Sequence, residues 1–149
     1  MQVSIKGIRA RLYSTHSSVP RAITVHVQQD SRQPANSRFV LASHHLSNPQ
    51  LQSHVHDIVL TVRYRGVVFN FLVFFKRHKF LPLNRSIQNL GGREVHGDVL
   101  LVACGIRVSV RNLRSGLEDR AADRAIRLLT EALDPMGTRH SFPETISFV

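Results

Sequence analysis

The stretch FFKRHKF at residues 74–80 combines cations with aromatic rings, and both kinds of side chain can hold nucleic acid. Cations neutralise phosphates, whereas exposed aromatic rings stack on bases. Phe74 and Phe75 end an apolar run, so we expect them in the core, with the cations in the loop that follows. The sequence therefore predicts phosphate or carboxylate contacts from this loop rather than base stacking. The candidate stacking rings that remain are Tyr13, Tyr64 and Phe80.

Further cations fall at the predicted ends of strands and in the adjoining loops. A turn at Arg65-Gly66 would place Arg63 and Arg65 at the opposite end of a hairpin from Lys76, so these cations do not form one patch automatically. Another predicted strand would carry Arg107 and Arg111 on one face. The candidate polyanion-binding residues are Lys76, Arg77, Lys79, Arg85, Arg93, Arg63, Arg65, Arg107 and Arg111.

The positive charge is unevenly distributed along the chain. The net charge is +10, and residues 1–93 carry 13 Lys and Arg but only two acids. Residues 94–149 carry seven Arg and eight acids, so nearly all of the excess lies in the first part of the chain. Such a surface attracts polyanions non-specifically. Most of the cations are arginine, and codon usage in a GC-rich genome would also give this abundance of arginine without any role in binding.

Nine histidines raise the question of a metal site. On a strand, His54 and His56 would present both imidazoles on one face, and His44 precedes them by ten residues. Three protein ligands are enough for a catalytic zinc site, but no HExxH or CxxC signature is present. We therefore predict no metal and no other cofactor. A small metal-dependent or hydrolytic enzyme that uses residues 44–56 stays as an alternative.

His96 and Asp98 offer a second catalytic interpretation, in which Asp98 orients His96 and either Ser109 or Cys104 is the nucleophile. Gly-Asp before a strand is also a common turn, in which the carboxylate accepts hydrogen bonds from backbone amides. Because no nucleophile motif accompanies the pair, we predict no catalytic residues. Cys104, the only cysteine, lies in the apolar run VLLVAC and is expected to be buried and inert.

The pattern of apolar residues also bears on the compartment. The longest apolar stretch runs from Val67 to Phe75, far short of the roughly 20 residues that a spanning helix needs. The N-terminal residues contain no apolar segment of the secretory type, and there is no cysteine pair. We therefore expect an intracellular protein, cytoplasmic or nuclear, without a membrane span.

Period-two alternation predicts several strands. The first covers Val3–Leu12, with a β-bulge at Gly7 where the alternation changes phase, and a second covers Ala22–Gln28. A short strand at Phe39–Ala42 precedes a long polar loop at 43–56. Strands at Ile58–Tyr64 and Val67–Phe75 form a hairpin, and the second is apolar on both faces, as central strands are. A last hairpin joins Val99–Cys104 to residues 106–111.

Two helices are expected. Asn84 is a suitable N-cap for a short helix that stops at Gly91. A longer amphipathic helix begins after Ser115, which forms a capping box with Glu118, and ends before Pro135. Within it, Asp123 and Arg127 have the spacing of an ion pair. Residues 135–149 form a tail or a short strand.

The segment FKRHKFLPLNRSIQNLGGREVHGDVLLVACG, followed by VRNLRSGLEDRAADRAI, resembles small uncharacterised proteins of mushroom-type fungi. The resemblance covers about residues 60–130 and rests on PLNRSI, on the strand entry GDVLLV and on the junction of NLR with the helix. No activity, cofactor or site residue follows from it.

Together these patterns predict one α+β domain over residues 1–149. We expect a mainly antiparallel β-sheet or partly open barrel of six to eight strands, with the C-terminal amphipathic helix packed on it. The function that the charges favour is a non-enzymatic binding module for nucleic acid or another polyanion. The main alternative is a protein-interaction or homo-oligomeric structural module that meets acidic partners.

Overall fold

The computed structural model describes residues 3–30, 38–39, 55–76, 80–105, 110–133 and 145–148. The strands and helices in this part of the chain are β1 (Val3–Tyr13), β2 (Arg21–Asp30), β3 (Arg38–Phe39), β4 (Val55–Tyr64), β5 (Val67–Lys76), α2 (Arg85–Asn89), β6 (Val99–Cys104), β7 (Val110–Arg111), α3 (Leu117–Ala132) and β8 (Thr145–Phe148).

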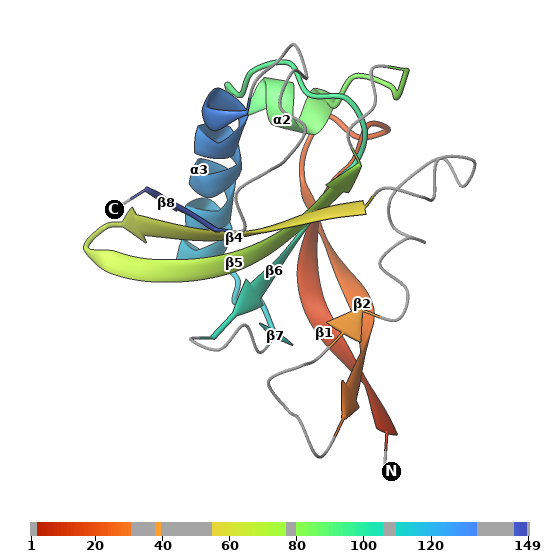
Figure 1. Ribbon diagram of the computed structural model, residues 1–149. Coiled ribbons are helices and arrows are strands. Elements are labelled where there is room, and N and C mark those ends of the chain that lie inside the picture. The colour runs from red at the N-terminus through yellow and green to blue at the C-terminus, as the bar shows by residue number, and fades with distance from the viewer. Residues whose placement is uncertain are drawn as a thin grey trace.

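The described strands form one eight-stranded sheet in the order β3-β2-β1-β6-β5-β4-β8, with β7 paired to β6. Neighbouring strands are antiparallel except β8, which runs parallel to β4. The sheet is open, since β3 and β8 form its two ends, and α3 packs on one side of it (Figure 1). The predicted α+β class, strand number and packed helix are confirmed, and the architecture is an open sheet rather than a barrel.

The β4–β5 hairpin turns at Arg65-Gly66, as the sequence predicts. Both residues have positive φ, 50° and 77°, which suits the tight turn of a two-residue hairpin. The predicted loop at 43–56 is too long at its C-terminal end, because β4 already begins at Val55. Val55 pairs with Lys76 and His56 with Phe75, so pairing with β5 overrides the polar local sequence. Residues 43–54 of that loop lie outside the described part.

The predicted β-bulge at Gly7 is wrong. The pairing of β1 with β2 runs without interruption from Val3, opposite Asp30, to Leu12, opposite Arg21. A bulge would shift this register by one residue. The unbroken alternation places Arg9 and Arg11 on one face of β1 and buried Ala10 on the other.

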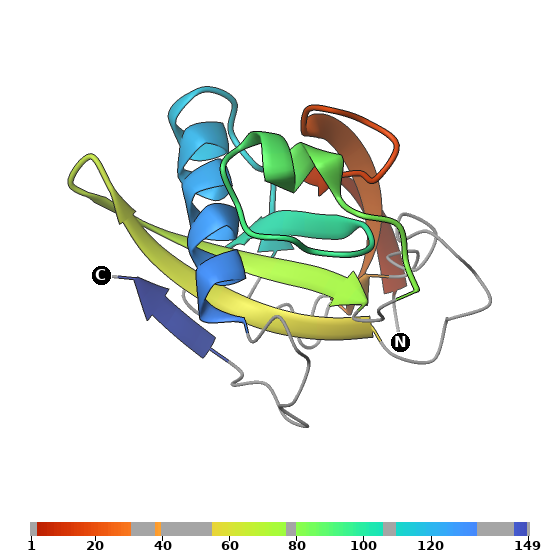
Figure 2. The same cartoon turned by 90° about the horizontal axis from the view of Figure 1, so that it is seen from above.

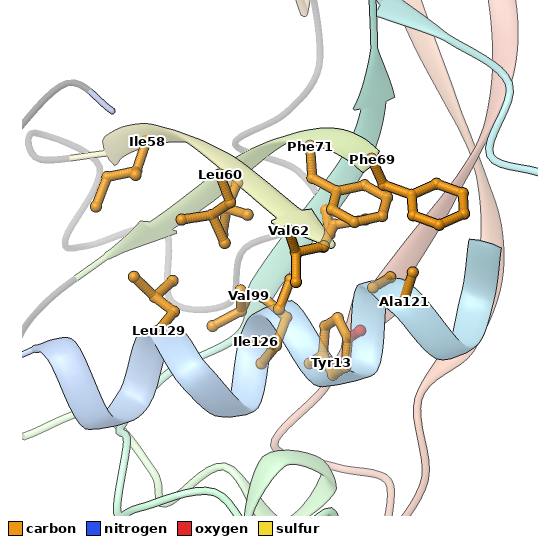
Figure 3. Close-up of a cluster of buried hydrophobic side chains, with 14 of the residues drawn as sticks. Tyr13, Ile58, Leu60, Val62, Phe69, Phe71, Val99, Ala121, Ile126 and Leu129 are labelled. Atoms are coloured by element: carbon orange, nitrogen blue, oxygen red, sulfur yellow. The ribbon is translucent and has the colours of Figure 1, made fainter. Parts of the chain in front are cut away.

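Apolar clusters cover both faces of the middle of the sheet. On the face of the sheet that α3 covers, Ile58, Leu60 and Val62 point toward the helix, where they meet residues such as Ile126 (Figure 3). The opposite face carries a second cluster that includes Ile8, Val25 and Leu100. Because β5 contributes Phe71 to the first cluster and Leu72 to the second, it is the central strand that its sequence predicts. Burying each such side chain stabilises the fold by about 1.5–3 kcal/mol.

The first turn of α3 differs from the predicted capping box. Gly116 is the N-cap, with φ 82°, and no side chain caps the helix. Glu118 does not complete a box with Ser115, because its carboxylate accepts hydrogen bonds from the Arg111 guanidinium and from the Arg114 N–H instead. The helix ends before Pro135, as predicted, and β8 confirms a short strand in the C-terminal tail.

The short helix α2 begins at the predicted cap. The Asn84 Oδ1 accepts from the Ile87 N–H at 3.0 Å, and the Asn84 Nδ2 donates to the Tyr13 and Gly97 carbonyls at 2.8 Å each. This buried amide therefore joins α2 to the end of β1 and to the turn before β6. Figure 2 shows α2 lying beside α3.

Candidate polyanion-binding surface

The structure separates the predicted cations rather than gathering them into one patch. Arg63 and Arg65 are exposed near the tip of the β4–β5 hairpin. Alternation places Arg63 on the face of Val59, away from Leu60 and Val62, so it lies on the side of the sheet opposite α3. The Arg65 guanidinium lies over the Tyr64 ring, 5.6 Å from its centroid.

Two other predicted cations lie on the side of α3. Arg85 is exposed on α2, and Arg93 is exposed in the connection from α2 to β6. The Arg93 N–H donates to the Thr130 Oγ1 at 3.0 Å, which fixes this connection against the C-terminal half of α3. Lys76 is the last residue of β5, but its side chain lies outside the described part, as do Arg77, Lys79 and Arg107.

Arg111 takes part in an internal ion pair. Its Nη1 and Nη2 donate to the two carboxylate oxygens of Glu118, both at 2.8 Å. The Glu118 side chain is only 4% exposed, so the pair is largely desolvated on the carboxylate side. Burial by itself would raise the pKa of Glu118, but the hydrogen bonds from Arg111 and from the Arg114 N–H lower it below its ordinary value. Arg111 therefore anchors α3 to β7.

A second group of ion pairs joins β1 to α3. The Arg9 guanidinium donates to both oxygens of Asp119, at 3.1 and 3.0 Å. The Arg11 Nε and Nη2 donate to the two oxygens of Asp123, at 2.8 and 2.9 Å. Bidentate pairs of this kind are stronger and more directional than single contacts between charges. The predicted ion pair within the helix between Asp123 and Arg127 is wrong, since Arg11 holds the Asp123 carboxylate.

Tyr13 completes this interface. Its ring is fully buried, and its hydroxyl donates to the Asp123 Oδ1 at 2.7 Å. Burial, with the negative charge of Asp123, raises the pKa of Tyr13 well above its ordinary value of 10.0. Tyr13 is therefore excluded as a stacking platform for a base. Of the other two candidate rings, Tyr64 is half-buried and Phe80 is 76% exposed.

The arginines of β1 and β7 reach α3 because β1 and β6 separate from each other beside the helix. β1 pairs with β6 only at Arg11–Tyr13. Beyond this point the β6 residue Ala103 pairs with Arg111, and the Leu113 N–H donates to the Arg9 carbonyl at 2.9 Å. Residues 110–113 thus fill the gap between β1 and β6, which brings all three arginines to the first half of α3.

These pairs change the charge of the outer surface. The acids Glu118, Asp119 and Asp123 point toward the sheet and are held by arginines. The opposite face of α3 presents Arg120 and Arg124, both exposed, and the half-buried Arg127. No ion pair joins these three arginines to an acid among the described residues.

We define the outer α3 surface as Arg93, Arg120, Arg124 and Arg127. Arg93 belongs to it because its backbone is bonded to Thr130, and the side chain of Arg127 lies beside Gly91, two residues before Arg93. The helical arginines are absent from the cations that the sequence selects, although their spacing of four and three residues already places them on one helix face. Two exposed acids, Glu94 and Glu131, border this surface.

The histidine interpretations receive no support from the described residues. His56 lies in β4 with its ring centroid 5.6 Å from that of Phe75, whereas His44 and His54 lie outside the described part. The described residues contain no group of three or more side chains that could hold a metal ion.

Both ring nitrogens of His96 lie against groups other than Asp98. The His96 Nδ1 lies 2.8 Å from the Leu81 carbonyl and its Nε2 lies 3.0 Å from the Glu94 Oε1. Asp98 accepts from the Thr15 N–H at 2.7 Å, as the turn interpretation expects of an aspartate that bonds backbone amides. Cys104 is buried as predicted, and burial raises the pKa of its thiol to about 11, so it is a poor nucleophile.

Comparison with protein-family models, with curated proteins and with solved structures found no match. The resemblance to fungal proteins therefore stays a prediction. No helix among the described residues is long and apolar enough to cross a membrane.

Proposed function

We propose that this protein is a non-enzymatic binding module for polyanions, with nucleic acid as the main ligand. The observation that carries the proposal is the inward pairing of the acids of α3. Because Arg9, Arg11 and Arg111 hold Asp119, Asp123 and Glu118 at the sheet, these carboxylates do not oppose an anion that approaches the outer face.

The charge asymmetry of the sequence supports the same function. A net charge of +10 attracts phosphates, and this attraction is strongest at low salt. Arginine suits phosphate because its planar guanidinium donates two parallel hydrogen bonds. The predicted cations Lys76, Arg77 and Lys79, whose side chains lie outside the described part, stay second candidate contacts for the same ligand.

Fluorescence anisotropy with labelled duplex DNA, duplex RNA, single strands of both kinds and heparin tests this function. We expect binding at low salt that weakens by at least about tenfold between about 50 and 200 mM salt, because bound phosphates release counterions. Absence of binding to every one of these polyanions at the lower salt concentration would refute the proposal. An intracellular location stays a prediction that imaging of a tagged protein would test.

A protein-interaction module is the second candidate, and a different observation favours it. Val67 and Val68 are 45% and 47% exposed near the tip of the β4–β5 hairpin. Successive side chains of a strand point to opposite faces, so the hairpin tip presents one exposed apolar side chain on each face, which a partner protein can contact. Light scattering after size-exclusion chromatography would show self-association; a monomer that recovers no partner in a pull-down would contradict this candidate.

A further inference from the structure

The three helical arginines of the outer α3 surface form a row along one face of α3, at spacings of four and three residues. A helix rises 1.5 Å per residue, so Arg124 lies about 6 Å and Arg127 about 10 Å along the axis from Arg120. Each strand of a nucleic-acid duplex carries one charge per about 3.4 Å of its axis, so a row of this length spans about three phosphates of one strand. Arg93 widens the row at the C-terminal half of the helix, where its backbone is bonded to Thr130.

The row contains no aromatic side chain. No aromatic residue is present in α3, and the ring of Tyr13 is fully buried. The exposed ring of Phe80 precedes α2 in the chain and is not part of this helix. Surfaces that bind single strands combine cations with rings on which successive bases stack. The outer α3 surface therefore suits a ligand whose phosphates are exposed and whose bases are stacked on each other.

The helix is also held in a fixed position. Three bidentate ion pairs bind its first half to β1 and β7, with donor–acceptor distances between 2.8 and 3.1 Å. A buried apolar face, including Ala122, Ile126 and Leu129, binds it to the sheet. A rigid support reduces the entropy lost when the outer arginines meet a rigid ligand.

From these observations we propose that the outer α3 surface binds the backbone phosphates of a nucleic-acid duplex and reads no base sequence. This inference rests on the proposed function, because it names the surface and the form of nucleic acid. Contacts to phosphate orient a protein on a duplex without carrying sequence information. Affinity should therefore depend on salt and on duplex form but vary little with base sequence.

The variant Arg120→Gln/Arg124→Gln tests the surface, and Lys6→Gln/Arg21→Gln is its matched control. Both variants remove two charges from exposed side chains, but the control removes them from the β1–β2 hairpin. Anisotropy is measured with a blunt DNA duplex, its two component single strands and a duplex of shuffled sequence, each over a series of salt concentrations. Circular dichroism melting checks that both variants fold.

We expect the helix variant to lose at least about tenfold in duplex affinity and to lower the slope of log affinity against log salt by about two. The control should keep the wild-type slope, and Arg120→Lys/Arg124→Lys should restore most of the affinity. Equal losses in the helix variant and the control would overturn the assignment to α3. Tighter binding of wild-type protein to single strands than to the duplex would overturn the assignment to duplexes.

The outcomes separate the two proposals. If the wild-type protein binds none of the nucleic acids, the proposed function fails. If it binds nucleic acid but the helix variant behaves like its control, the function stands and only the role of the outer α3 surface fails. A large difference in affinity between the two duplex sequences would refute sequence-independent binding alone.

Discussion

Arg11 of β1 and Asp123 of α3 are 112 positions apart in the chain, yet their Nε and Oδ1 atoms lie 2.8 Å apart. The side chains are 14% and 23% exposed, so the pair is largely shielded from water. It fixes the long C-terminal helix to the first strand. The same contact keeps the carboxylate of Asp123 away from the arginines of the outer α3 surface.

Replacement of Asp123 with Ala should destabilise the protein by about 3 kcal/mol, because Arg11 and Tyr13 would lose their shared acceptor. The free energy of unfolding in urea measures this loss. The control Asp57→Ala removes an exposed carboxylate and should change stability by less than about 0.5 kcal/mol. A double-mutant cycle with Arg11→Ala should give a coupling of about 1–3 kcal/mol; a coupling near zero would show that the ion pair contributes nothing.

Replacement of Tyr13 with Phe should cost about 1 kcal/mol at neutral pH, because it removes the hydroxyl that donates to Asp123. The pKa of Tyr13 is raised in the folded protein, so its contribution is present below pH 10.0 and is lost as the pH rises above that value, where the unfolded chain ionises. The stability difference between wild type and Tyr13→Phe should therefore shrink above pH 10. A difference that stays constant in alkaline urea titrations would contradict the raised pKa.

Replacement of Glu118 with Gln should cost about 1–3 kcal/mol at neutral pH, because it weakens the buried bidentate contact with Arg111. The folded-state pKa of Glu118 lies below its ordinary value of 4.5, so its contribution is present above pH 4.5 and is lost as the pH falls through the folded pKa. Thermal melting from neutral to acidic pH should show the two proteins converging below pH 4.5. The control Glu131→Gln alters an exposed residue of the same helix and should follow wild type throughout.

Replacement of Asn84 with Ala should cost about 2–4 kcal/mol, because it removes the cap of α2 and leaves the Tyr13 and Gly97 carbonyls without their donor. Asn89 in the same helix is the matched control, since its exposed amide donates only to the Ser18 carbonyl among the described residues. Asn89→Ala should cost well under 1 kcal/mol. Equal losses from the two variants, measured by chemical denaturation, would show that Asn84 has no role beyond that of a surface asparagine.

Local sequence determined most of the elements. Alternation of apolar residues predicted β2 and β4, continuous apolar runs predicted β5 and β6, and the Asn84 cap and the Arg65-Gly66 turn were predicted at their observed places. These features depend on neighbours within a few residues, since side-chain period and turn conformation are local properties of the backbone. The amphipathic pattern of residues 117–132 likewise predicted the helix α3.

The incorrect predictions share a physical cause. The bulge at Gly7, the capping box at Ser115 and the Asp123–Arg127 pair were each inferred from residues close together in the chain. In the folded protein, β2 pairs with β1 through Gly7 without a break, Arg111 takes Glu118, and Arg11 takes Asp123. A partner brought by the fold competes with the local one and displaces it where its geometry is better.

The sequence by itself determined the excess of positive charge and the α+β class. Only the tertiary structure decided which arginines face solvent. Arg9, Arg11 and Arg111 turn inward to three carboxylates of α3, whereas Arg120 and Arg124 remain on the outside. Charge is a sum over the chain and needs no fold, but the pairing of charges requires contact between β1, β7 and α3, which only the folded sheet brings together.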